Sequence, residues 1–321
     1  MLNITKMSKV NKSLAIAIPT YNRAQILNEN LMLILDELIF FQIPVYISDD
    51  SNNEDTKNLI LQLQNKHDLI FYHKNEITLG HDLNFFRTIK LPKEDYVWYL
   101  GDSIIIKVGA IEKILGIISL AHYDFISCNA DGRELDVSER VFNDGGELFE
   151  KLCWHLTFTG ATIYSRENVN NLANFDVFKF KNFPQTAFIF EMFSFKKSRL
   201  YWINDKLVYV NDKKKSYWTK NVFQVFINDF KFFLYNLDDS YPLEIKEKVI
   251  LQHSVKSKVF SLRAFVKYRL NDFFDFETFI KYERDFSKYT EPNLFVLFIV
   301  SIIPISITKL LLKMVGVKFK L

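Results

Sequence analysis

Residues 96–103 read Tyr-Val-Trp-Tyr-Leu-Gly-Asp-Ser, an apolar run that ends on one carboxylate, that of Asp102. A continuous apolar run of this length is typical of a strand that is buried on both faces. In open α/β sheets, ligands bind in the crevice outside the carboxyl ends of the strands. The position of Asp102 therefore makes it a candidate ligand-binding acid. An Asp in an ordinary turn after the strand is the alternative.

The segments around this run alternate between strand and helix patterns. Short apolar runs predict strands over residues 14–18, 45–48, 69–72 and 96–100. Apolar residues at helical spacing predict helices over residues 26–41, 55–64, 84–89 and 110–120. Since strands that alternate with helices form parallel sheets with right-handed crossovers, the sequence predicts an α/β fold with a mostly parallel sheet flanked by helices.

Composition limits the class of protein. The 321 residues are 49% hydrophobic with a net charge of +3, which suits a globular chain with one large domain or one domain and an appendage. The 2 cysteines lack a CxxC spacing, which argues against a disulfide scaffold or a thiolate metal site and fits a reducing compartment. The charge is too small for a nucleic-acid binder, and no glycine-rich turn follows the first strand, as a Rossmann oxidoreductase requires. We expect no signal peptide, because the first apolar run, Leu14–Ile18, is too short.

Polar residues follow three of the predicted strands. Pro19-Thr20-Tyr21, Asp49-Asp50 and Asp102 would emerge on the same edge of a parallel sheet. Carboxylates accept hydrogen bonds from hydroxyl and N–H groups, and hard oxygens suit Mg²⁺ or Mn²⁺. This edge therefore suits a ligand with ribose hydroxyls, a base N–H and a metal-bound diphosphate. For Asp49-Asp50 the alternative is helix capping and turn formation.

Four motifs in order along residues 12–120 resemble the family 2 glycosyltransferases of the GT-A fold, which is Rossmann-like. They are Ile18–Arg23, Ile47–Ser51 with Thr56, Asn75 with Leu79–Asn84, and Tyr96–Asp102. The resemblance implies transfer of a sugar from a nucleotide-diphosphate donor to an acceptor hydroxyl, with inversion at the anomeric carbon. It covers hexosyl- and deoxyhexosyltransferases, including abequosyltransferase-like enzymes of bacterial O-antigen and capsule synthesis.

The same resemblance implies the residues that bind the donor, namely Pro19, Thr20, Tyr21, Arg23, Asp50, Gly80, Asp82, Asn84 and Asp102. Of these, the first three would line the base and ribose pocket, and Asp50 would hydrogen-bond the pyrimidine ring. Gly80 would let the backbone pass close to the donor, with Asp82 and Asn84 near the base or ribose. Arg23 would approach the diphosphate. The alternatives are a solvated Arg23 and an Asp82 that caps a helix.

Asp102 matches the first acid of the family's DXD signature and would contact ribose or a divalent metal, Mn²⁺ or Mg²⁺. The chain departs from the signature after that residue, because Ser103 and Ile104–Ile106 follow where further acid is usual. Mg²⁺ is usually held by one or two carboxylates together with phosphates and water. The departure leaves metal dependence open, and it leaves open a degenerate, non-catalytic protein that binds a nucleotide sugar or a partner.

An inverting transfer needs a general base to take the acceptor's proton. By resemblance, an acid is expected some twenty residues after Thr159-Gly160-Ala161, but Phe183–Thr186 contains none. Glu191 is the next acid, and we predict that it is the catalytic base, with Asp131 and His155 as further candidates. A carboxylate on a helix surface is the alternative for Glu191.

The C-terminal third predicts contact with a membrane. From Gln252 to Asn271 all charged side chains are basic and alternate with apolar ones, which predicts a basic amphipathic helix. Leu294–Thr308 is apolar apart from hydroxyls, is interrupted by Pro304 and is followed by lysines, but it is shorter than a spanning helix. Packing on the protein core is the alternative for both segments.

We therefore predict a catalytic domain over residues 1–215, a helical region over 216–290 and a membrane-associating tail over 291–321. The predicted partners are a nucleotide-diphosphate sugar, a lipid-linked glycan acceptor and the cytoplasmic membrane surface, but no nucleic acid. The predicted location is cytoplasmic, with peripheral attachment to the inner face of the cell membrane.

Overall fold

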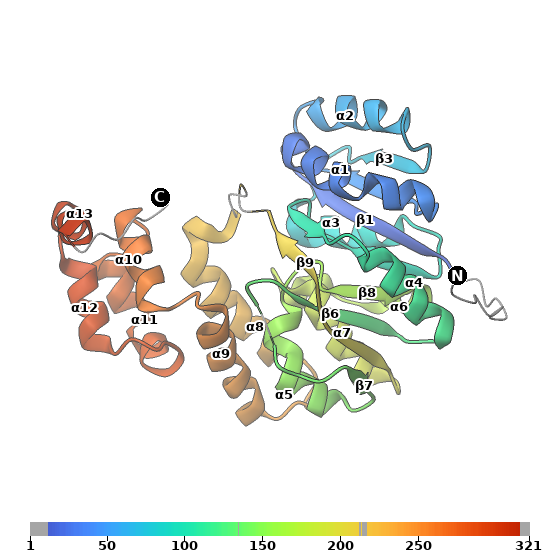
Figure 1. The fold of residues 1–321 in the computed structure, drawn as a ribbon. Coiled ribbons are helices and arrows are strands. Elements are labelled where there is room, and N and C mark those ends of the chain that lie inside the picture. The colour runs from blue at the N-terminus through green and yellow to red at the C-terminus, as the bar shows by residue number, and fades with distance from the viewer. Residues whose placement is uncertain (1–11, 134, 212, 214–216, 315–321) are drawn as a thin grey trace, which may run out of the picture. The chain divides into compact units, whose positions relative to one another are not determined.

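The structure is a computed structural model that describes residues 12–133, 135–211, 213 and 217–314. The chain divides into two compact units, each described here by itself (Figure 1). Unit 1 holds the described residues of 1–148 and 156–214, and unit 2 holds those of 149–155 and 215–321. Whether residues 1–215, 216–290 and 291–321 act as separate functional parts stays a prediction.

Unit 1 is built on one mixed sheet, whose main path runs in the order β3-β2-β1-β4-β8-β6-β9-β5, with β7 paired to β9. The strands are β1 (Leu14–Thr20), β2 (Val45–Asp49), β3 (Ile70–Lys74), β4 (Tyr96–Tyr99), β5 (Ile104–Ile106), β6 (Phe125–Ala130), β7 (Arg140–Phe142), β8 (Thr162–Ser165) and β9 (Leu200–Val210). The three pairings among β1 to β4 are parallel, as are β6 and β9. The predicted α/β fold is confirmed.

Helices flank this sheet. They are α1 (Ala24–Phe40), α2 (Asp55–Gln64), α3 (Gly80–Lys90), α4 (Ala110–Leu120), α5 (Gly145–Leu156, part of which belongs to unit 2), α6 (Arg166–Asn171) and α7 (Pro184–Phe195), with 3₁₀ turns at Leu172–Asn174 and Val177–Phe180. The central strands are buried on both faces, and Ile16, Val97 and Trp98 have no exposed surface. This explains why these strands read as continuous apolar runs without alternation.

The second half of the sheet contains antiparallel strands that the sequence analysis did not predict. β8 pairs antiparallel with both β4 and β6, and β5 pairs antiparallel with β9. β5 begins two residues after Asp102, so the chain turns at that acid and re-enters the sheet. A three-residue apolar run so close to a longer one gives no separate periodic signal, which is why the strand was missed.

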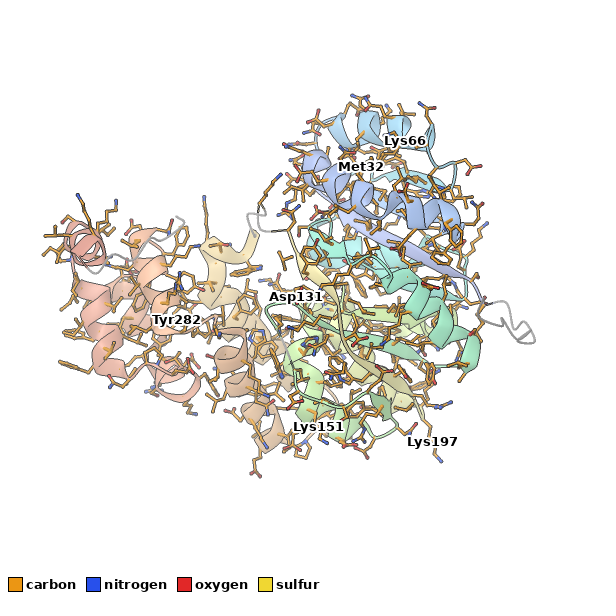
Figure 2. All side chains as sticks on the ribbon, viewed as in Figure 1. Met32, Lys66, Asp131, Lys151, Lys197 and Tyr282 are labelled. Carbon is orange, nitrogen blue, oxygen red and sulfur yellow. The ribbon has the colours of Figure 1, made fainter. Side chains whose placement is uncertain are left out.

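Unit 2 is helical. After a 3₁₀ helix (Tyr217–Asn221) and a π-helix (Gln224–Asp229), its helices are α8 (Phe230–Tyr235), α9 (Leu243–Ser257), α10 (Leu262–Leu270), α11 (Phe276–Tyr289), α12 (Leu294–Ile302) and α13 (Ile305–Met314). Phe223 lies at the centre of an aromatic core, with ring centroids 5.5–5.9 Å away in Phe260, Phe265, Tyr268, Phe274, Tyr282 and Phe286. Tyr282 is labelled in Figure 2. Aromatic side chains therefore build this core.

The predicted single helix over residues 252–271 is wrong, because the chain forms two helices there. Lys258 ends α9 in the left-handed region, at φ 59°, and Ser261 caps α10 by accepting a hydrogen bond from the backbone N–H of Ala264. Between them Phe260 is buried in the aromatic core. A left-handed residue followed by a serine cap is a common way to end one helix and begin the next.

The apolar tail is also divided. Pro304 separates α12 from α13, and the Arg269 side chain donates a hydrogen bond to the carbonyl of Ile303 at 3.0 Å. Leu297 is fully buried and belongs to the aromatic core of unit 2. Within the described residues, none of the helices combines the length and apolar character needed to cross a bilayer.

Candidate functional site

The carboxyl ends of β1, β2 and β4 lie side by side. The backbone N–H of Asp50, after β2, donates to the carbonyl of Thr20 at 3.0 Å, and Leu100, after β4, donates to the carbonyl of Ala17 at 3.0 Å. The loop after β1 is tied to the loop after β2, because the backbone N–H of Asn22 donates to the Ser51 hydroxyl at 2.8 Å. The strand ends thus share one edge of the sheet, as the alternating pattern predicts.

Asp102 lies at the centre of this edge and is 6% exposed. Its Oδ1 accepts a hydrogen bond from Arg23 Nη1 at 2.9 Å, which makes an ion pair, and its Oδ2 accepts from the Thr20 hydroxyl at 3.2 Å. Arg23, 24% exposed, immediately precedes α1. The ion pair joins a buried acid to a partly exposed arginine side chain.

Asparagine side chains hold the backbone at Asp102. Asn30 on α1 donates to the carbonyl of Asp102 at 2.8 Å, and Asn211 after β9 donates to the Asn30 side chain at 2.9 Å. The backbone N–H of Asn211 also donates to the carbonyl of Ser103 at 2.9 Å. Neither asparagine is predictable from sequence, because 181 positions separate them and neither lies in a motif.

Asp50 caps a helix other than the one that follows it in sequence. Its carboxylate accepts from the backbone N–H groups of Leu79 at 3.0 Å and Gly80 at 2.8 Å, at the start of α3, and from the Asn75 amide at 2.7 Å. Gly80 has φ 75°, a conformation that glycine adopts without strain. The Asp50 carboxylate thus caps the start of α3, and its contact with a pyrimidine ring stays a prediction.

Asn84 and Asn75 extend this cluster inward. The Asn84 side-chain oxygen accepts from the Ser48 hydroxyl at 2.7 Å, from Asn75 at 3.2 Å and from Thr88 at 3.2 Å. At 4% exposure, Asn84 supports the strand ends from within. Asn75 contacts Asp50 and Asn84 at once, a role that its place in the motif with Leu79–Asn84 did not predict.

Asp82 is not the cap of α3 that was considered as an alternative, since it lies within the first turn of that helix. Its two carboxylate oxygens accept the backbone N–H of Asn182 at 3.1 Å each, and its Oδ1 is 2.8 Å from His81 Nδ1. The contact with Asn182 brings the segment before α7 to the start of α3. Tyr21 is 49% exposed, and its neighbour Pro19 is half-buried at the end of β1.

The Asp49 side chain is buried and binds groups within the sheet, not at its ligand-binding edge. Its carboxylate has no exposed surface and accepts from the backbone N–H of Ser51, the Tyr72 hydroxyl and the Lys74 ammonium at 2.9, 2.8 and 3.3 Å. Burial, together with the Asp49 carboxylate, raises the pKa of Tyr72. The two adjacent acids therefore have different partners: Asp49 binds groups on β3, and Asp50 binds the start of α3.

The Thr159-Gly160-Ala161 segment lies directly against the residues around Asp102. The Trp98 indole donates to the carbonyl of Gly160 at 2.9 Å, and a side chain at Gly160 would lie 3.0 Å from Ile104 and 3.2 Å from Leu100. Gly160 has φ 107°, in the region that favours glycine. The segment singled out by resemblance thus packs beside the predicted donor-binding acid.

The candidate bases lie on several elements. Gln185 is 4% exposed in the first turn of α7, and Glu191 lies half-buried six residues later on the same helix. Asp131, labelled in Figure 2, follows β6 and forms ion pairs with Lys107 at 2.6 Å and Lys206 at 3.6 Å. His155, in α5, has no exposed surface.

The site's acids give a poor set of metal ligands. Asp102 is one carboxylate whose two oxygens already accept hydrogen bonds, and the next residue, Ser103, adds a neutral hydroxyl with no exposed surface. Across the part of the chain that the structure describes, no group of three or more His, Cys, Asp or Glu residues could hold a metal ion. Mg²⁺ is usually held by one or two carboxylates together with substrate phosphates and water.

Comparison with known proteins places the chain in a family. The model of glycosyl transferase family 2 matches residues 15–179, about half of the chain. The match includes the carboxyl ends of β1, β2 and β4. The chain belongs to glycosyl transferase family 2. The resemblance stated from its four motifs is therefore confirmed.

Two curated relatives are similar over shorter stretches. Abequosyltransferase RfbV of Salmonella typhimurium is 34% identical over 92 residues, 28% of each chain. GalNAc(5)-diNAcBac-PP-undecaprenol beta-1,3-glucosyltransferase of Campylobacter jejuni is 27% identical over 103 residues, which cover 32% of this chain and 33% of the relative. The aligned stretches thus span about a third or less of these relatives.

Solved glycosyltransferase structures share the fold. The mannosyltransferase PcManGT of Pyrobaculum calidifontis, in complex with GDP-Man and Mn²⁺, matches with a TM-score of 0.55 and 13% identity, over 95% of this chain and 88% of that one. S. aureus TarS 1–349 in complex with UDP matches with a TM-score of 0.54 and 14% identity, over 81% and 80%. At these identities the likeness shows the GT-A architecture.

Proposed function

We propose that this protein is an inverting glycosyltransferase, of the hexosyl or deoxyhexosyl class, in bacterial surface polysaccharide synthesis. It moves a sugar from a nucleotide-diphosphate donor to a hydroxyl of a lipid-linked glycan acceptor. One observation carries the proposal: in a family 2 chain, the ends of β1, β2 and β4 join Thr20, Asp50 and Asp102 in one hydrogen-bonded set. Curated relatives named for sugar transfer support it.

The donor would lie across this edge of the sheet. Pro19, Thr20 and Tyr21 provide a loop for the base and ribose, and the half-exposed Tyr21 ring offers a surface on which a base can stack. The Asp50 carboxylate accepts from Asn75 and from the start of α3, so its orientation is fixed. Gly80, Asp82 and Asn84 lie on α3, whose first residue, Gly80, donates to Asp50. A fixed acceptor recognises a pyrimidine N–H without first having to be ordered.

The transfer is a displacement at the anomeric carbon. The acceptor oxygen forms a bond to that carbon, the bond to the diphosphate breaks, and its electron pair leaves with the nucleoside diphosphate. The acceptor's proton goes to a carboxylate, for which we propose Glu191. Gln185 is an amide and cannot take a proton at neutral pH, which leaves Glu191 as the nearest acid in sequence after the place where the resemblance predicts one.

The proposal of a lipid-linked acceptor rests on features of unit 2 that suit a membrane surface. α10 packs against both α12 and α13, so two segments without any acidic residue, 252–271 and 292–314, lie together. Phe295, Ile302 and Leu310 are exposed there at 71%, 45% and 58%, alongside the exposed Lys267 and Lys309. Exposed apolar side chains beside lysines suit the headgroup region of an anionic membrane. We propose peripheral attachment to the cytoplasmic leaflet on this basis.

Titration of the purified protein with UDP, CDP, dTDP and GDP, followed by thermal unfolding, tests the donor site. One pyrimidine nucleotide is expected to stabilise the fold by about 2.7 kcal/mol at a hundredfold excess over its dissociation constant. Asp50→Asn keeps an oxygen for the N–H groups of α3 but weakens the predicted base contact, so its shift is expected to be smaller. Asp36→Asn, at an exposed position on α1, is the matched control.

Sugar turnover from a nucleotide sugar tests the catalytic step with the same samples. We expect Glu191→Gln to lower turnover by about 10²–10⁴-fold while nucleotide binding is unchanged. Full activity in this variant would exclude Glu191 as the base. Nucleotide binding by the unaltered protein without any turnover, across donor sugars and acceptors, would instead favour a non-catalytic nucleotide-sugar-binding protein.

A further inference from the structure

The ion pair between Arg23 and Asp102 disagrees with the cofactor that the family implies. A divalent metal at the DXD signature needs a carboxylate oxygen directed at the ion, but both oxygens of Asp102 are engaged, one by a guanidinium. The neighbouring Ser103 brings no negative charge, and its hydroxyl is fully buried. The residues present do not fit a protein-held Mn²⁺ or Mg²⁺.

We propose that the Arg23 guanidinium takes the place of this metal as the cation that binds the donor's diphosphate. The inference rests on the proposed function and deepens it, since it names the group that stabilises the leaving nucleoside diphosphate. A guanidinium stays protonated at all physiological pH values, and its five donors in one plane can bind a carboxylate and phosphate oxygens at once.

The position of Arg23 suits this role. It follows β1 directly and precedes the first turn of α1, so it lies at the sheet edge where Thr20 and Asp102 meet. Its side chain is 24% exposed whereas that of its partner acid is 6% exposed, so Arg23 is the more exposed member of the ion pair. The first turn of α1 holds no acidic residue, and its N-terminus adds partial positive charge beside the guanidinium.

Asp102 then acts as a positioning residue. Its buried carboxylate fixes the guanidinium through Oδ1, and the carboxylate is itself fixed by Thr20 and by the backbone contact from Asn30. A cation that is already in place needs no reorganisation when charge develops on the departing diphosphate, which is the condition for efficient electrostatic stabilisation. During transfer the bond between the anomeric carbon and the phosphate oxygen breaks, and Arg23 stabilises the charge that this oxygen gains.

Binding measurements with and without metal test the proposal. Isothermal titration compares UDP with uridine, or the CDP and dTDP pairs if those nucleotides are preferred, in EDTA and in Mn²⁺. For the unaltered chain we expect equal affinity for the diphosphate in both buffers. We expect Arg23→Gln to weaken diphosphate binding by about 10- to 100-fold, as loss of charge-assisted hydrogen bonds does, and to leave nucleoside binding unchanged.

Three further measurements make the test decisive. Arg23→Lys is expected to recover only part of the loss, because an ammonium lacks the planar fork that binds two oxygens. Arg87→Gln, at an exposed position near the end of α3 away from Gly80, should bind like the unaltered chain. Thermal unfolding of each variant without nucleotide reports whether the fold is intact.

Two results would overturn the proposal but not the proposed function. The first is that Mn²⁺ strengthens diphosphate binding about tenfold or more. The second is that Arg23→Gln weakens the binding of uridine and of UDP equally. The absence of nucleotide binding by the unaltered chain would overturn the proposed function together with this inference.

Discussion

At the scale of the residue, Gly160 is the position where adding a single methyl group has the clearest predicted effect on stability. Its φ of 107° and the 3.0 Å and 3.2 Å contacts that a side chain would make with Ile104 and Leu100 disfavour any other residue. We expect Gly160→Ala to lower the free energy of unfolding of unit 1 by roughly 1–3 kcal/mol. Chemical denaturation followed by tryptophan fluorescence measures the change.

Gly116 supplies the matched control, because it lies inside α4 and a side chain there would contact nothing within 4 Å. Gly116→Ala should raise stability by about 0.5–1 kcal/mol, since glycine is a poor helix former. The same chemical change is thus expected to have opposite signs at two positions. Equal effects would mean that the Thr159–Ala161 segment does not pack against the residues around Asp102.

Residue-scale contacts were the least predictable from sequence. The motifs located Asp50 and Asp102 at strand ends, and the parallel register places them together. The sequence could not show that Asp50 holds the start of α3, nor that Asn30 and Asn211 steady Asp102, because these hydrogen bonds join residues far apart in the chain. Such contacts depend on the tertiary fold and leave no periodic signal.

At the scale of the element, the strand and helix patterns in the first 120 residues were predicted well, apart from the short strand β5. Helices α2 and α4 have the predicted bounds, because their apolar residues recur at helical spacing and turn residues flank them. The break between α9 and α10 was not predicted. Lys258 and Ser261 lie within an unbroken helical pattern, and the burial of Phe260 decides the outcome there.

This break makes a prediction about glycine. Lys258 has φ 59°, which costs a lysine about 1 kcal/mol that glycine avoids, so Lys258→Gly should leave the stability of unit 2 unchanged or raise it by up to about 1 kcal/mol. Lys267→Gly, at an exposed position inside α10, should lower it by about 1 kcal/mol. Circular dichroism during thermal unfolding compares the two, and equal destabilisation would indicate one continuous helix.

At the scale of the whole molecule, membrane attachment is best tested without shortening the chain. Deletion of residues 291–321, the change that the sequence first indicates, would remove Leu297 from the core of unit 2. Phe295 and Leu310 are exposed, so Phe295→Asp with Leu310→Asp leaves the core intact. After cell lysis and sedimentation, we expect less of this double variant than of the unaltered chain in the membrane pellet. We also expect it to bind vesicles that contain anionic lipid less tightly.

Leu243→Asp is the control, since Leu243 is 64% exposed on α9 and belongs to neither acid-free segment. It should sediment with membranes like the unaltered chain. Unchanged sedimentation of the double variant would exclude the face formed by α10, α12 and α13 as the attachment surface. Binding to uncharged vesicles as tight as to anionic ones would show that the lysines do not contribute.

On the proposal that Arg23 replaces the metal, the ion pair between Arg23 and Asp102 has a consequence for the cell that makes this protein. An arginine is translated with the chain and cannot be withdrawn by a chelator, by a host that sequesters manganese or by a competing metalloprotein. Glycan assembly at this step would then continue when transition metals are scarce. Transferases that need a bound Mn²⁺ ion would slow down under the same conditions. The glycans on the cell surface under metal starvation would then depend in part on which transferases use an arginine instead of a metal to bind the diphosphate.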